Sequence, residues 1–145
     1  TLQCLIGKAE HYVLGQKPYE ASETFETSAS TSKPRFTRFN ERRKATKEMQ
    51  TCAASYSWLS NAAKMNTYLM RHAWKKYTAP MLIIQAEQDD YVWTSQIQKF
   101  ADKIKKHGIA ECEYLYLSET KHETYSSNDE TMDKYINKIL AFLQK

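Results

Sequence analysis

Two short segments of this sequence carry side chains that could exchange protons. Residues 85–92 (QAEQDDYV) hold three carboxylates, and residues 118–123 (SETKHE) hold His122. A carboxylate that accepts a hydrogen bond from an imidazole fixes its tautomer, and the imidazole can then act as general base and general acid. This chemistry also needs a nucleophile that the histidine activates.

Each of these segments follows a stretch that predicts a β-strand. Residues 81–84 (MLII) come directly after Pro80 and suit a buried parallel strand, and residues 112–117 (CEYLYL) predict a second strand. A helix is predicted after each strand, and this strand–helix–strand–helix order favours parallel pairing in an α/β sheet. Because parallel strands present functional groups at their carboxyl ends, the acid and His122 are expected to meet there.

Helix boundaries can also be read from the sequence. Thr94 or Ser95 is expected to cap the first of these helices, and Gly108 is expected to end it in the left-handed conformation. Ser127 and Glu130 have capping-box spacing before the last helix. The apolar face predicted for that last helix comprises Met132, Tyr135, Ile136, Ile139, Leu140 and Leu143.

The first half of the chain is richer in polar and aromatic residues. Residues 20–34 predict a loop, residues 35–50 a helix, and residues 55–76 a longer helix with apolar side chains on more than one side. That pattern predicts that the longer helix is covered on more than one side. Its aromatic and methionine side chains could line an acyl-chain pocket or simply pack in a core.

Composition excludes several classes of function. The chain has 145 residues, 41% of them hydrophobic and 26% charged, which is typical of a globular protein. It has no apolar run near the ~18 residues that a membrane span requires. Its three glycines cannot form the GxGxxG, GxxxxGK[ST] or GxSxG motifs, so standard dinucleotide, P-loop and nucleophile-elbow sites are absent from this sequence.

Charged residues and cysteines give weaker signals. The net charge is +4, and the basic residues within 33–47 could bind nucleic acid or form a solvated helix face. The solvated face is favoured because no RNA-binding, zinc-finger or helix-turn-helix signature accompanies them. The three cysteines are widely spaced without a CxxC pair, which predicts free thiols in a reducing cytoplasm rather than disulfides or a zinc site.

Two stretches resemble a known family. Residues 79–93 (APMLIIQAEQDDYVW) and 118–130 (SETKHETYSSNDE) are similar to the last two catalytic segments of α/β-hydrolases, more narrowly of the lysophospholipase and monoacylglycerol-lipase-like group. The resemblance implies that Asp89 is the triad acid and His122 the triad base. Asp90 is the alternative acid, but Asp89 stands three residues before Val92, as in the family pattern.

The other histidines and Glu123 have no comparable setting. His11, His72 and His107 are expected on the surface or in packing roles, and Glu123 is expected to stabilise its loop.

The resemblance also implies an organisation for the whole chain. Residues 22–44 and 55–62 are similar to the helical cap of bacterial lysophospholipases, so residues 1–78 are predicted to form a cap. Residues 79–145 are predicted to be the C-terminal β-α-β-α portion of the hydrolase core. The implied activity is hydrolysis of lipid esters such as lysophospholipids or monoacylglycerols, without a metal or cofactor.

The family's nucleophile and oxyanion hole precede the cap, and this sequence contains neither. We therefore expect a C-terminal fragment of a serine hydrolase that is inactive alone. A non-catalytic binding or structural module is the alternative. The expected partner is the missing N-terminal half, or a second copy joined through exposed sheet edges, and not nucleic acid. The expected location is the cytoplasm, with a peripheral position on the inner membrane face as a variant.

Overall fold

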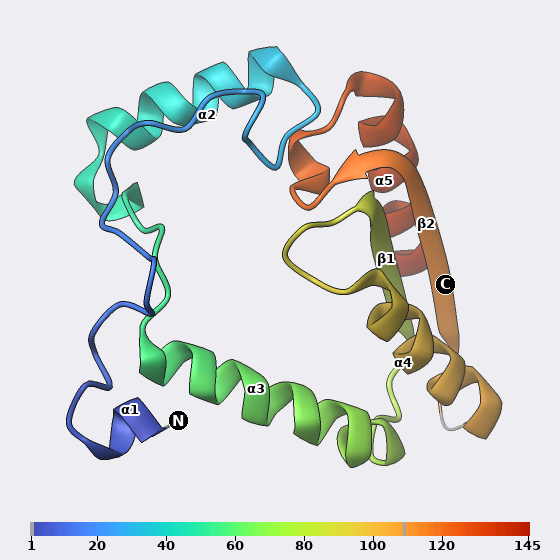
Figure 1. Cartoon of the computed structure of the whole chain (residues 1–145). Coiled ribbons are helices and arrows are strands. Elements are labelled where there is room, and N and C mark those ends of the chain that lie inside the picture. Colours follow the sequence, from blue (N-terminus) through green and yellow to red (C-terminus); the bar gives the residue numbers. More distant parts are fainter. Residues whose placement is uncertain (1, 109) are drawn as a thin grey trace. The chain divides into compact units, whose positions relative to one another are not determined.

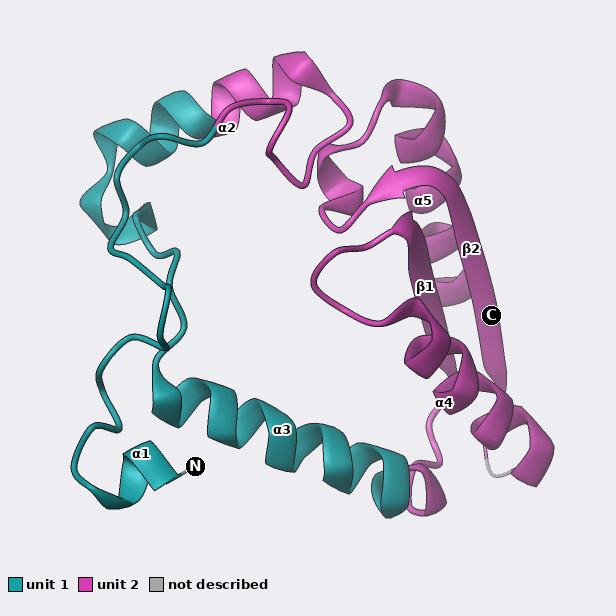
Figure 2. Ribbon diagram, in the orientation of Figure 1, with its two compact units in different colours: residues 1–23, 40–73 teal, residues 24–39, 74–145 magenta. Residues whose placement is uncertain are grey.

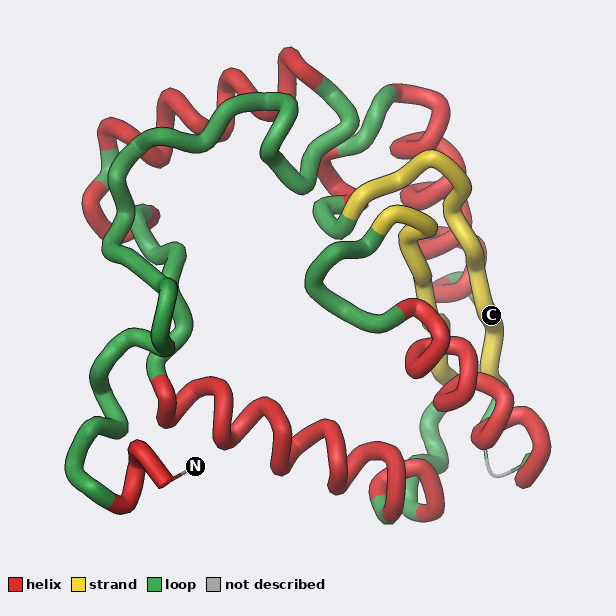
Figure 3. Tube along the Cα trace, viewed as in Figure 1, coloured by secondary structure: helices red, strands yellow, loops and turns green. Residues whose placement is uncertain are grey.

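The two halves of the chain differ in secondary structure (Figures 1 and 3). We describe residues 2–108 and 110–145 in a computed structural model. The first half is helical, with α1 (Leu2–Leu5), α2 (Lys33–Ala45), α3 (Tyr56–Arg71) and short 3₁₀ turns at Lys47–Met49 and Ala73–Lys75. The second half contains β1 (Met81–Gln88), α4 (Thr94–His107), β2 (Cys112–Lys121), a 3₁₀ turn at Thr124–Ser126 and α5 (Asp129–Leu143).

The chain forms two compact units (Figure 2). Unit 1 comprises residues 1–23 and 40–73, and unit 2 comprises residues 24–39 and 74–145. Unit 2 is therefore built from two separate stretches of sequence, and one of them contains a polar loop and the first part of α2. The division into a cap over residues 1–78 and a core portion over residues 79–145 stays a prediction.

The sheet of unit 2 consists of β1 and β2 paired in parallel. The register runs without interruption from Met81 opposite Cys112 to Ala86 opposite Leu117. An irregularity follows Ala86, and pairing resumes with Gln88 opposite Lys121. This parallel pair confirms the predicted α/β fold class, and both strands extend beyond the ranges predicted from the apolar runs.

The helices α4 and α5 pack on opposite faces of this sheet. On one face, Lys105 of α4 lies 5.7 Å from the ring centre of Tyr114. On the other face, Lys138 of α5 forms an ion pair with Glu113. Successive strand residues point to opposite faces, so neighbouring positions on β2 bind different helices. The most buried apolar residues of the unit are Ala86, Leu117, Ala101 and Ile104.

Of the three helix ends predicted for unit 2, one is confirmed and two are wrong. Gly108 ends α4 with φ 59° and ψ 24°, as predicted, and its N–H donates to the carbonyls of Ile104 and Lys105. The N-cap of α4 is Trp93, not Thr94 or Ser95. The capping-box prediction for α5 is also wrong: its N-cap is Asn128, whose side-chain oxygen accepts from the Thr131 N–H.

A physical reason accounts for both differences. Before α4, the carboxylate of Asp89 forms a turn over Tyr91 and Val92 and leaves Trp93 in an extended conformation at the helix entry. Before α5, Asn128 supplies the oxygen that accepts from the Thr131 N–H, while the buried hydroxyl of Ser127 makes no hydrogen bond within the described residues. Short polar side chains compete for such helix ends, and here the residue directly before α5 takes the position.

Unit 1 exposes most of the apolar surface of α3, which contradicts the prediction that this helix is covered on more than one side. No residue of α3 is buried. The exposed apolar side chains of α3 include Trp58, Leu59, Met65, Tyr68 and Leu69. Within the described residues of unit 1, the helix packed against α3 is the four-residue α1, which is too short to cover it.

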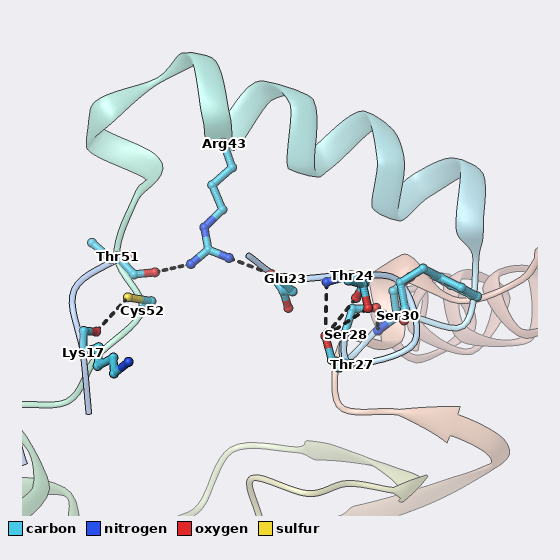
Figure 4. A network of polar contacts seen from close by, with 10 residues as sticks. Lys17, Glu23, Thr24, Thr27, Ser28, Ser30, Arg43, Thr51 and Cys52 are labelled. Atoms are coloured by element: carbon cyan, nitrogen blue, oxygen red, sulfur yellow. Dashed lines mark hydrogen bonds and ion pairs between the residues drawn. The ribbon is translucent and has the colours of Figure 1, made fainter. Parts of the chain in front are cut away.

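Unit 1 is also held by a polar network at the end of α2 (Figure 4). The guanidinium of Arg43 donates to Glu23 at 2.9 Å and to the Thr51 carbonyl at 2.7 Å, and it lies over the ring of Tyr19. In unit 2, Arg35 forms an ion pair with Asp129. These two arginines of the basic segment therefore serve intramolecular contacts.

No helix of the described chain is both long and apolar enough to cross a membrane.

Candidate active site

Asp89 lies just beyond the carboxyl end of β1, where the chain turns towards α4. Its side chain is only 7% exposed. One carboxylate oxygen, Oδ1, accepts hydrogen bonds from the backbone N–H groups of Tyr91 and Val92, each at 2.9 Å. The neighbouring aspartate, Asp90, which was the alternative acid, is exposed. These two backbone bonds fix the carboxylate in place and direct its other oxygen away from the turn.

His122 follows β2 directly and meets Asp89 across the ends of the two strands. The Nδ1 atom lies 2.8 Å from Oδ2 and 3.0 Å from Oδ1 of Asp89. The parallel pairing of β1 and β2 brings the two residues together although 33 positions separate them. With Nδ1 donating to the carboxylate, Nε2 is the ring atom that can accept a proton. The side chain of His122 is 42% exposed, so the ring can be reached from solvent.

The surroundings favour the charged form of Asp89. Burial acts to raise the pKa of this carboxyl, because it removes water from the charge. The hydrogen bonds from His122, Val92 and Tyr91 outweigh burial, so the pKa of Asp89 lies below its ordinary value. An ionised, desolvated carboxylate beside Nδ1 is the arrangement that stabilises an imidazolium formed during proton transfer.

A second carboxylate stabilises the strand ends next to this pair. Glu87 Oε2 accepts from the backbone N–H of Glu119 at 2.7 Å, across the irregularity in the β1–β2 register. Glu119 has φ 51°, a left-handed conformation that a residue with a Cβ rarely adopts. The hydrogen bonds from the Glu119 N–H and the Tyr116 hydroxyl hold the pKa of Glu87 below its ordinary value. This bond fixes the backbone three residues before His122.

The site contains one contact that sequence reasoning missed. The ring of Tyr91 lies 5.0 Å from that of His122, centre to centre, at an interplanar angle of 50°. Tyr91 is 70% exposed, and its place in the turn after Asp89 brings it over the imidazole. The sequence carried no signal for this contact, because an exposed tyrosine in a turn has no periodic pattern. The left-handed Glu119 was equally invisible, since the sequence has no glycine there.

His72, His107 and Glu123 make contacts with other residues. The ring centres of His107 and Trp74 lie 4.3 Å apart, and those of His72 and Tyr68 lie 5.8 Å apart. Glu123 forms a hydrogen bond with the side chain of Tyr125 in the loop after His122. Among residues 2–108 and 110–145, no group of three or more histidine, cysteine or acidic side chains is arranged to hold a metal ion.

The α/β fold, with an acid and a histidine at the ends of neighbouring parallel strands, defines the C-terminal part of an α/β-hydrolase. The model of the prolyl oligopeptidase family matches residues 21–145, and the chain belongs to that family. No curated protein and no solved structure matches the chain. The match supports assignment of the chain to the α/β-hydrolase superfamily and indicates that its parent protein is a hydrolase. The matched residues include both Asp89 and His122.

Proposed function

We propose that Asp89 and His122 are the acid and the base of a serine hydrolase triad. The observation that carries this proposal is the 2.8 Å contact between Oδ2 of a buried carboxylate and Nδ1 of an accessible imidazole. Membership of the prolyl oligopeptidase family supports it, because the match includes both residues. The chain order, acid before histidine, is also that of α/β-hydrolases.

The reaction would proceed by acyl transfer. Nε2 of His122 takes the proton of a serine hydroxyl as its oxygen bonds to the substrate carbonyl carbon, and Asp89 stabilises the resulting imidazolium. His122 then returns the proton to the leaving group as the carbonyl is restored. In the second half of the reaction, Nε2 of His122 takes a proton from a water molecule as the water oxygen bonds to the acyl carbon. His122 then gives that proton to the serine oxygen as the acyl–serine bond breaks and the acid is released.

The nucleophile is proposed to come from outside these 145 residues. The sequence has glycine only at positions 7, 15 and 108, so no serine lies in a GxSxG elbow. A polypeptide region that carries this serine and the oxyanion hole would complete the site. A second copy of the chain is the other proposed partner, because in the described part of the chain the outer edges of β1 and β2 are unpaired. Such a copy would cover these edges but would not supply the nucleophile.

A carboxylic ester of a lipid is the proposed substrate, of the lysophospholipid or monoacylglycerol kind. The likeness of residues 79–93 and 118–130 to that group of hydrolases supports it. The exposed apolar side chains of α3 are suitable for an acyl chain, and a shallow hollow on this helix is lined by Leu59, Ser60, Ala63, Lys64 and Thr67. A peptide bond is the second candidate, because the matched family is named for oligopeptidases.

Labelling with a fluorophosphonate probe tests the proposal. The protein isolated from its source is treated with the probe, and the labelled serine is located by mass spectrometry of peptides. We expect a labelled serine on the polypeptide that contains these residues or on one bound to it, and we expect His122→Ala to abolish the labelling. Labelling that survives His122→Ala, or no labelling of any such serine, would overturn the proposal. Parallel assays with a lysophospholipid and a prolyl peptide then separate the two substrate classes.

A further inference from the structure

Residues 28–30 hold the chain on both sides of His122. The Lys121 ammonium donates to the Ser28 carbonyl at 2.9 Å, and the Glu123 N–H donates to the Ala29 carbonyl at 3.1 Å. The residue before His122 and the residue after it are thus bound to consecutive residues of a loop more than 90 positions away. The Glu123 bond therefore fixes the backbone directly after His122, and the Lys121 bond ties the preceding residue to the same loop through its side chain.

Ser30 connects the same loop to the turn that follows His122. Its Oγ lies 2.7 Å from both the carbonyl and the hydroxyl oxygens of Ser126, and the Ser32 N–H also donates to the Ser126 carbonyl at 3.1 Å. Ser30 is 1% exposed and Ser126 is 5% exposed. Figure 4 shows Ser28 and Ser30 on the loop before α2. Breaking hydrogen bonds between groups so well shielded from solvent costs free energy, because it leaves a buried donor or acceptor without a partner.

The ring of His122 itself has few restraints. Its side chain is 42% exposed, and its ring contacts are with Asp89 and Tyr91, both from the turn after β1. An exposed ring of this kind keeps its orientation only if its backbone is placed correctly. A displacement of about 1 Å would exceed what an aligned Nδ1–carboxylate bond tolerates.

We infer that Ser30 and Lys121 are positioning residues for His122, acting through residues 28–30 to hold Nδ1 against Asp89. This inference rests on the proposed role of the Asp89–His122 pair. It assigns a function to a loop whose sequence resembles a cap and which lies in unit 2 together with both members of the pair. The role is positional, because Ser30 binds the turn after His122 and Lys121 binds the loop at Ser28, so both act on the chain that carries the imidazole.

The tautomer of His122 tests this inference without a need for activity. The 145-residue chain is labelled with ¹⁵N-histidine, and the Nδ1 and Nε2 shifts are followed as the pH is raised until they no longer change, so that the tautomers of the neutral ring are compared. We expect the proton of the native protein on Nδ1. In Ser30→Ala and Lys121→Met, the ratio of the Nδ1–H to the Nε2–H form should fall about 5-fold, the factor that one net hydrogen bond of about 1 kcal/mol provides.

Control variants separate positioning from general loss of structure. Lys121→Arg keeps a cationic donor for the Ser28 carbonyl and should restore the native ratio. Ser118→Ala changes an exposed serine on β2 and should leave the ratio unchanged. If circular dichroism shows that Ser30→Ala does not fold, the comparison of Lys121→Met with Lys121→Arg tests the inference alone. Native tautomer ratios in Lys121→Met would overturn the inference, whereas a native protein without the proton on Nδ1 would overturn the proposed function.

Discussion

The left-handed Glu119 offers a measurable test of the backbone at the end of β2. Its φ of 51° costs a residue with a Cβ about 1–2 kcal/mol, and glycine removes that cost. Glycine also increases the entropy of the unfolded chain, which offsets about 0.4–1 kcal/mol of the gain. The Glu119 side chain is exposed, and the N–H that binds Glu87 remains in the variant. Glu119→Gly should therefore stabilise the protein by about 0.5–1 kcal/mol.

Urea unfolding followed by circular dichroism measures this change. With a slope of about 2 kcal/mol per molar urea, the midpoint should rise by about 0.3–0.5 M. Glu119→Ala keeps the strained conformation and should leave the midpoint nearly unchanged, which separates strain from charge. Ser118→Gly, one residue earlier and outside the left-handed region, should lower the free energy of unfolding by about 0.5–1 kcal/mol. A lower midpoint for Glu119→Gly than for the native chain would refute the reasoning.

Three further outcomes follow from the structure. Ser127→Ala should raise the free energy of unfolding by about 1 kcal/mol in urea titrations, because its buried Oγ has no hydrogen-bond partner among the described residues, whereas Ser126→Ala should lower it by about 0.5–1.5 kcal/mol. Gly108→Ala should lower the melting temperature, because alanine is strained by about 1 kcal/mol at φ 59°, and an unchanged value would contradict the assigned cap. The folded pKa of Asp89 lies below its unfolded value, so its stabilisation is present above the unfolded pKa and is lost as pH falls through the folded pKa. Asp89→Asn should therefore be less stable than the native protein near neutral pH and should approach it in acid, and a difference that grows in acid would contradict this sign.

The sequence predicted the elements that carry the site because their signals are local. The apolar run after Pro80 marked β1, and the alternation from Cys112 marked β2. Gly108 marked the end of α4 because few other residues accept a left-handed cap. The order of strands and helices was enough to bring Asp89 and His122 to one end of the sheet, where the structure shows them in contact.

The contacts that position His122 could not be predicted in the same way. They join the carbonyls of Ser28, Ala29 and Ser126 to distant donors, and every residue has a carbonyl. The choice of Asn128 over Ser127 as the cap could not be predicted either, because both are short polar residues that favour this position. Apolar periodicity predicted α3 as a helix, but periodicity does not say whether anything is present to cover it.

The discontinuous make-up of unit 2 has a consequence for biosynthesis. Ser30 and Ser126 are 96 positions apart, and Arg35 and Ser127 are 92 apart. At about 5–20 residues per second, roughly 5–20 s pass on the ribosome between synthesis of the loop and synthesis of its partners. During that interval residues 24–39 lack the turn that they bind in the folded unit. The emerging chain is therefore expected to depend on chaperones until the His122 turn leaves the ribosome.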